Sequence, residues 1–275
     1  MMTDTLLILA GGASSRMKNS IDSNLSPEKS VQANKRSKGL IEVNGKPFLS
    51  YLLDNVLKAG FKNVIIITGE NSELFQSIYD KNEEFLSLNI KFATQYIPKG
   101  RVKPFGTADA VYQSIIQYPE LKNKKFCVCN SDNLYSLEVF RLLRESNYEQ
   151  ALIAYDRDKL LYPKERISRF AVMRFFENYQ LTEIIEKPDQ KKIPDYLDKE
   201  NKVRISMNIF LFNGKIFFKY LEECPIHPDR DEKELPSAIM NMIADNHKIF
   251  GITVGENVPD LTSKEDISKL EDYLN

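Results

Sequence analysis

Arg16 follows an apolar run and a Gly-Gly turn in the stretch LLILAGGASSRM (6–17). A strand that ends in such a turn brings backbone N–H groups and one guanidinium toward the same point, an arrangement suited to an anion. The turn lacks both the G-x-G-x-x-G fingerprint and the G-x-x-x-x-G-K-[ST] P-loop. The stretch therefore predicts an anion site of neither common type, and the rest of the sequence must identify the anion.

Polar residues also gather in five later segments that adjoin apolar runs or predicted helices. These segments are SKGLIEVNGKP (37–47), FGTADAV (105–111), CNSDNLY (129–135), IIEKP (184–188) and PDLTSKED (259–266). Each has an ordinary structural interpretation: Lys38 as a solvated lysine, Thr107 as a helix N-cap, Asp132 as a turn cap. Lys187 would then lie in a surface turn, and Asp260 would help to cap the last helix. As a set they suit polyanion chemistry, because lysines neutralise phosphates and aspartates bind Mg²⁺.

Strands and helices alternate through the first half of the chain. Apolar runs predict strands at 6–10, 63–68, 90–95 and 125–130. Helical spacing predicts one helix over 48–57, with Gly60 as its C-cap glycine, and another from Thr107 to before Pro119. This order predicts an α/β fold of Rossmann-like type, with a doubly wound, mostly parallel mixed sheet flanked by helices. Ligands of such a sheet bind at the carboxyl ends of its strands.

The second half is richer in strands than in helices. Strands are predicted at 151–156, 169–175, 181–186, 204–212 and 248–254. Helices are predicted at 214–223, 233–245 and 263–274. In the last of these, Ser263 and Asp266 have the spacing of a capping box. No repeat or low-complexity linker separates the halves, so we expect a single domain over 1–275.

Residues 18–37 interrupt this regular order. The segment KNSIDSNLSPEKSVQANKRS is polar and lacks periodicity, although it connects a strand to a helix. A connection of that length is usually functional or irregular. It carries Lys29, Lys35 and Arg36, so it is interpreted either as an irregular insertion or as a mobile basic lid over an anion.

The composition excludes several classes of partner. The chain has 275 residues, with 38 basic and 39 acidic side chains, and its formal charge is −1. No overall positive field attracts nucleic acid or a membrane surface, so neither is expected as a partner. The three cysteines (Cys127, Cys129 and Cys224) lack C-x-x-C spacing, which favours a reduced, cytoplasmic setting. No apolar run reaches the length of a transmembrane helix, and the first is too short for a signal peptide.

Taken in order, the polar segments resemble the signatures of the sugar-1-phosphate nucleotidyltransferases, the NDP-sugar pyrophosphorylases. The resemblance implies the nucleotide-diphospho-sugar transferase type of fold, with a nucleotide-binding half (1–135) and a sugar-phosphate-binding half (136–275). The turn at Ala10, Gly11 and Gly12 would wrap an NTP. Arg16 would meet the phosphates, and Lys38 would neutralise the reacting α-phosphate.

The resemblance also assigns roles to residues in the later segments. Those implied to read the nucleobase are Gln95, Gly106 and Thr107. Those implied to bind the sugar phosphate are Glu186, Lys187 and Asn208, the last at the position of a family glycine. Those implied to bind Mg²⁺ are Asp132 and Asp260. The chain departs from the family pattern at Ser37, Ser131, Thr262 and Lys264.

The implied reaction transfers a nucleotidyl group from an NTP to a sugar-1-phosphate and releases pyrophosphate with the help of Mg²⁺. It requires no general base, because a phosphate monoester is already ionised near neutral pH. Two alternatives stay open: a catalytically silent regulatory homologue that binds nucleotide, and a nucleotidyltransferase acting on a non-sugar phosphorylated acceptor. The nucleobase, the sugar and the presence of a homo-oligomer are also open.

Overall fold

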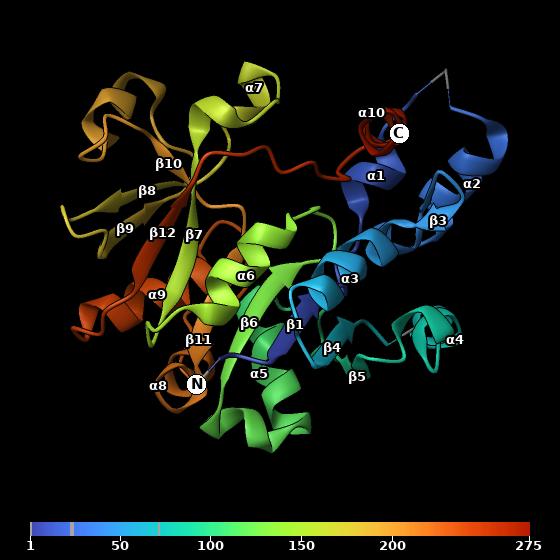
Figure 1. Cartoon of the computed structure of the whole chain (residues 1–275), viewed down its shortest axis with the longest axis horizontal. Coiled ribbons are helices and arrows are strands. Elements are labelled where there is room, and N and C mark those ends of the chain that lie inside the picture. Colours follow the sequence, from blue (N-terminus) through green and yellow to red (C-terminus); the bar gives the residue numbers. More distant parts are fainter. Residues whose placement is uncertain (1, 23–24, 71) are drawn as a thin grey trace.

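A sheet of ten strands forms the centre of the molecule and runs through both halves of the chain. The computed structural model describes residues 2–22, 25–70 and 72–275. The strand order is β5-β4-β1-β6-β11-β7-β10-β8-β9, and β12 also pairs with β7 (Figure 1). The first-half strands are β1 (Thr5–Leu9), β4 (Asn63–Thr68), β5 (Asn89–Thr94) and β6 (Lys125–Asn130), and they pair in parallel.

The second-half strands add mainly antiparallel pairs to this sheet. They are β7 (Ala151–Asp156), β8 (Val172–Phe175), β9 (Leu181–Ile185), β10 (Arg204–Ile205), β11 (Ile209–Asn213) and β12 (Phe250–Val254). Strand β11 joins the halves, because it pairs antiparallel with β6 on one side and with β7 on the other. Strand β12 is parallel to β7. The predicted α/β fold with a mixed sheet flanked by helices is confirmed.

Helices cover both faces of the sheet and bury alternate strand residues. Helices α3 (Phe48–Lys58) and α6 (Leu137–Glu145) pack on one face, together with Leu6 and Ile8 of β1. Helices α5 (Thr107–Gln117), α8 (Gly214–Glu222) and α9 (Leu235–Ala244) pack on the other face, together with Leu7. A strand that is buried on both faces needs an unbroken apolar run, and this explains the continuous apolar sequences of β1 and β4. No helix in the described ranges is both long enough and apolar enough to cross a bilayer.

The predicted strand over 204–212 is wrong in one respect, since the structure divides it into β10 and β11. Residues 206–208 leave the sheet between them, and Asn208 has a left-handed φ of 57°. The Tyr135 hydroxyl donates a hydrogen bond to the Met207 carbonyl at 2.6 Å. This buried hydrogen bond holds the residues between the two strands in place, and Asn208 lies directly before the first residue of β11.

The described residues of the segment 18–37 are largely helical, contrary to the expectation of an irregular insertion. Helix α1 (Ser15–Asn19) enters it, and α2 (Pro27–Lys35) occupies its second half. The Ser26 hydroxyl accepts a hydrogen bond from the Lys29 N–H, and Pro27 follows the cap as the first helical residue. Residues 23 and 24 lie outside the described residues.

Two of the basic residues in this segment are engaged in the scaffold. Lys29 forms an ion pair at 2.5 Å with Glu271 of α10 (Glu265–Leu274), and Arg36 pairs with Glu42 at 2.8 Å. Figure 1 shows α1, α2 and α10 gathered at one end of the molecule, so the last helix of the chain lies beside two of its first helices. The remaining elements are β2 (Glu42–Val43), β3 (Lys46–Pro47), α4 (Glu73–Tyr79) and α7 (Lys164–Ile167).

Candidate functional site

A cavity of about 960 Å³ opens at the carboxyl ends of β1 and β6. Predicted site residues from both halves line it: Arg16, Thr107, Asp132, Glu186, Lys187, Asn208 and Asp260. Lys38 reaches it through its contact with Asp132. The other predicted nucleotide residues, Ala10, Gly11, Gly12, Gln95 and Gly106, are not among the lining residues.

The two predicted metal ligands are carried by backbone segments that pair with one another. Asn133 forms an antiparallel bridge with Asp260. The Leu261 N–H donates to the Asp132 carbonyl at 2.8 Å, and the Leu134 N–H donates to the Pro259 carbonyl at the same distance. The chain leaving β6 and the chain approaching α10 are thereby held together, and both carboxylates border one cavity.

Each of these carboxylates has a basic side chain as its partner. Lys38 Nζ lies 2.7 Å from Asp132 Oδ2. Arg166, which lines the same cavity, donates to Asp260 through one terminal nitrogen. Asp266 accepts from both terminal nitrogens, at 2.8 Å from the other one and at 3.3 Å from the one that contacts Asp260. The Arg166 guanidinium also lies over the Tyr162 ring, 4.8 Å from its centre.

The two aspartates beside Arg166 differ in the direction of their pKa shifts. Burial disfavours ionisation of both. For Asp266, hydrogen bonds from Arg166 and from the N–H groups of Ser263 and Thr262 outweigh burial, and they lower its pKa. Burial raises the pKa of Asp260 to about 6, and the neighbouring carboxylates Asp266 and Asp132 add to the rise. The predicted capping box is only half formed: the Asp266 carboxylate accepts from the Ser263 N–H, but the Ser263 hydroxyl donates to the same carboxylate at 3.1 Å, and Lys264 is the N-cap of α10.

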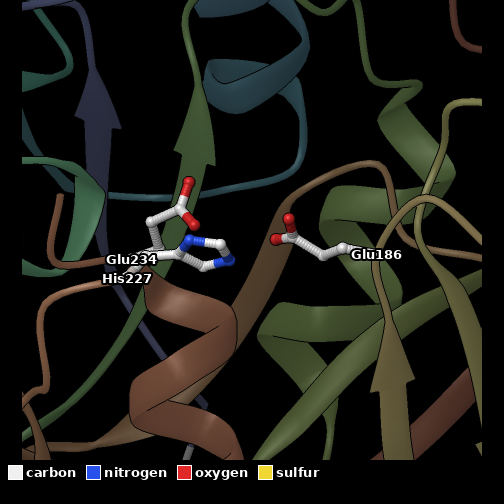
Figure 2. Close-up of side chains that lie close together, drawn as sticks. All are labelled: Glu186, His227 and Glu234. Carbon is white, nitrogen blue, oxygen red and sulfur yellow. The ribbon is translucent and has the colours of Figure 1, made fainter. Parts of the chain in front are cut away.

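A second ionic cluster lies on the predicted sugar-phosphate side of the cavity. Ligand atoms of Glu186, His227 and Glu234 lie within 4.8 Å of one another, and Figure 2 shows Glu186 facing the other two. Arg230 lies between the two carboxylates, with one nitrogen 2.5 Å from Glu186 and the other 2.5 Å from Glu234. His227 Nδ1 accepts a hydrogen bond from the Asp229 N–H at 3.2 Å. The guanidinium accounts for the convergence of the carboxylates without a metal.

Two predicted cations differ from Lys38 in having no carboxylate partner. Neither Arg16 nor Lys187 forms an ion pair within the part of the chain that the structure describes. Both are exposed and both line the cavity. Lys187 has a left-handed φ of 47°, which bends the chain directly after Glu186. These two side chains are therefore accessible to an incoming anion.

The predicted nucleobase residues form a packed group beside the cavity. The buried Gln95 donates its side-chain N–H groups to the Gly106 carbonyl and to Asp109, each at 2.9 Å. A Cβ on Gly11 would lie 3.2 Å from the Gly69 nitrogen, so the first turn packs tightly on the chain that follows β4. Gln95 thus positions Gly106 at the start of α5.

The prediction that Thr107 caps its own helix is wrong, because Gly106 occupies the N-cap position of α5. The Thr107 hydroxyl instead accepts a hydrogen bond from the Leu235 N–H, at 3.0 Å. Leu235 is the first residue of α9. The side chain therefore supplies a cap for a helix of the other half of the chain.

Several residues of the cavity were not predicted from the sequence, among them Arg166, Arg169, Arg230 and Glu234. They occur in the charge-rich stretches PKERISR (163–169) and DRDEKE (229–234). Such stretches are ordinarily solvated, and no spacing within them indicates a site. Only the order of the strands reveals that both stretches border the same cavity.

Residues 6–256 match the family model described as nucleotidyl transferase. The chain belongs to the nucleotidyl transferase family. This confirms the expected family and an enzymatic, nucleotide-transferring function. The fold is also similar to the crystal structure of a UDP-glucose pyrophosphorylase complexed with UDP-glucose, with a TM-score of 0.73. The two chains are 17% identical over 99% of this chain and 98% of that chain.

Gly106 should be sensitive to substitution by alanine. It has a φ of 99°, and a Cβ there would lie 2.3 Å from the Lys233 carbonyl oxygen. We expect Gly106→Ala to lower stability by about 1–3 kcal/mol or more, measured as a fall in the thermal unfolding midpoint. Gly12→Ala is the matched control, since nothing lies within 4 Å of its added Cβ. Equal midpoints for the two variants would contradict the expectation.

Proposed function

We propose that this enzyme transfers a nucleotidyl group from an NTP to a sugar-1-phosphate and releases pyrophosphate. The observation that carries the proposal is one cavity lined from both halves, with Arg16 from one half and Lys187 from the other, neither of them in an ion pair with any described residue. The similar solved structure is a UDP-glucose pyrophosphorylase, which supports a sugar nucleotide as the product. The shared sheet, joined through β6 and β11, supports the two halves acting as one domain.

In the proposed reaction, an oxygen of the sugar phosphate attacks the α-phosphorus of the NTP, and the bond to pyrophosphate breaks. Both substrates are polyanions, so catalysis depends on positioning and on charge neutralisation. The turn at Ala10, Gly11 and Gly12 would approach the phosphates with its backbone, and Arg16 would fork onto their oxygens. Lys38, already at the cavity beside Asp132, would neutralise charge at the α-phosphate.

The proposed metal ligands are Asp132 and Asp260. Their backbone segments pair, both side chains border the cavity, and carboxylate oxygens are donors that Mg²⁺ favours. When bound there, Mg²⁺ would supply charge neutralisation to phosphate oxygens. The electrostatic effect of Asp132 on the pKa of Asp260 supports a pair of carboxylates close enough to share a dication.

On the acceptor side, Lys187 is the proposed ligand of the sugar phosphate, because it is a free cation on the cavity wall. Glu186 and Asn208 are proposed to contact the sugar. Arg230 holds the Glu186 carboxylate at 2.5 Å, which fixes the position of its oxygens. Gln95, Gly106 and Thr107 are proposed to form the nucleobase site on the other side.

A pyrophosphate-release screen tests the proposal directly. The four common NTPs and dTTP would be combined with a panel of sugar-1-phosphates in the presence of Mg²⁺. Turnover with one such pair supports the proposal and identifies both substrates. If turnover occurs only with a phosphorylated alcohol or another non-sugar acceptor, the sugar-1-phosphate is the wrong acceptor. Nucleotide binding without turnover would indicate a catalytically silent homologue.

Lys38 should affect turnover more strongly than folding. We expect Lys38→Ala to lower kcat at least ~10²-fold, the usual loss when one preorganised electrostatic contact is removed. Steady-state kinetics checks this, with Lys35→Ala as the control because Lys35 is exposed on α2. Near-normal turnover of the Lys38 variant would show that another cation acts on the α-phosphate.

Lys187 should act on the acceptor and not on the NTP. We expect Lys187→Ala to raise KM for the sugar-1-phosphate ~10-fold or more and to change KM for the NTP little, because a charge-assisted phosphate contact is lost at one subsite. Lys192→Ala removes an exposed lysine nearby and serves as the control. A comparable rise in both KM values would argue against two separate subsites.

The two aspartates should share one dependence on Mg²⁺. We expect Asp132→Asn and Asp260→Asn each to shift the Mg²⁺ concentration for half-maximal activity upward ~10-fold or more, because each removes a charged ligand. A Mg²⁺ titration of initial rates measures the shift. If Asp260→Asn keeps the wild-type dependence while Asp132→Asn loses it, Asp260 is not a ligand.

A further inference from the structure

Both oxygens of the Asp260 carboxylate are engaged within the protein. One accepts a hydrogen bond from Arg166, and the other accepts one from the Thr262 hydroxyl at 3.1 Å. The Asp260 side chain is only 10% exposed. A dication that takes this buried carboxylate as a ligand would therefore compete with these partners for the two oxygens.

Charge decides which partner must leave. A guanidinium and a dication on one buried carboxylate repel one another, whereas a neutral hydroxyl adds no such penalty. Arg166 has other partners besides Asp260, since Asp266 accepts from both of its terminal nitrogens, at 2.8 and 3.3 Å, and Tyr162 lies under its plane. Asp266 and Tyr162 therefore hold Arg166 in place, and its contact with Asp260 is the one that a metal ion would replace.

We infer that Arg166 is a tethered cation that holds Asp260 until a divalent metal takes this carboxylate, and that its freed N–H groups then bind a substrate phosphate. The inference rests on the proposed function. It gives Arg166 a positioning role in the empty cavity and a phosphate-binding role in the loaded one. The location of Arg166 in the cavity wall allows both.

The exchange couples the metal to the substrates. Metal binding alone must break the contact between Arg166 and Asp260, and the guanidinium then loses one acceptor. A phosphate in the cavity supplies a new acceptor, so metal and phosphate should each strengthen the binding of the other by the same factor. Without Arg166, the metal should bind more tightly on its own and gain less from the phosphate.

Mn²⁺ is a suitable probe, because its free concentration can be measured by electron paramagnetic resonance. We expect Arg166→Gln to lower the Kd for Mn²⁺ at least ~10-fold in the absence of substrate, the effect of one close charge in a partly buried site. The Kd for Mn²⁺ is then measured again with inorganic triphosphate and with glucose-1-phosphate, each corrected for its own Mn²⁺ binding. The compound that tightens Mn²⁺ binding in the wild type but not in Arg166→Gln identifies the phosphate that Arg166 binds.

Arg169→Gln is the matched control. Arg169 lines the same cavity three positions further on and, within the described ranges, forms no ion pair. The control removes an equal charge without touching Asp260, and we expect its Kd for Mn²⁺ to stay close to the wild-type value. Equal tightening in both variants would reflect the general field of the cavity and would overturn the inference.

An unchanged or higher Kd for Mn²⁺ in a folded Arg166→Gln protein would also overturn the inference. The same holds if both phosphates still strengthen Mn²⁺ binding in that variant as they do in the wild type.

If Arg166→Gln does not fold, Arg166→Lys replaces it. A lysine is shorter and lacks the planar fork of the guanidinium, so a Kd below the wild-type value is expected, and an unchanged Kd contradicts the inference. Asp132→Asn distinguishes failure of the proposed metal site from failure of the inference. An unchanged Kd for Mn²⁺ in this variant refutes the proposed metal site, and the inference falls with it. A raised Kd in this variant, together with a Kd that does not respond to the Arg166 substitution, overturns the inference alone.

Discussion

Charge compensation between carboxylates and tethered cations is the interaction on which the cleft depends. An ionised carboxylate in a partly buried wall is costly unless a cation and hydrogen bonds accompany it. Lys38 does this for Asp132, Arg166 does it for Asp260, and Arg230 does it on the acceptor side. The same cations are the groups that a pair of polyanionic substrates would need, so the empty cavity already contains the charges of the loaded one.

The fold brings these charges together through strand order and not through local sequence. Asp132 follows β6, and Asp260 follows β12, which pairs with β7 at some distance from β6 in the sheet. The bridge between Asn133 and Asp260 closes that gap at the rim. The sheet therefore sets the approximate position of each carboxylate, and a few backbone hydrogen bonds beyond the strands set the final one.

The sequence predicts the parts of this arrangement that have a strong local signal. Strands β4 and β6 are predicted to the residue, because unbroken apolar runs are needed for strands buried on both faces. The family motifs predict residues that do gather in one cavity, such as Asp132 and Lys187. Helix α2 is missed because a short polar helix buries little and has weak periodicity. Arg166 is missed because its partner Asp260 is 94 positions away, and a contact of that kind leaves no pattern in a charged stretch.

The start of α5 and the start of α9 are joined more tightly than their places in the chain suggest. Leu235 donates to Thr107, the Lys233 N–H donates to the Phe105 carbonyl at 2.8 Å, and Gly106 lies directly against Lys233. One segment adjoins the proposed nucleobase site, and the other carries Arg230 toward the proposed acceptor site. An engineer who wished to change the base preference by exchanging 105–107 would also move the acceptor wall. In this scaffold the two specificities have to be redesigned as a single unit, with 229–235 transplanted alongside.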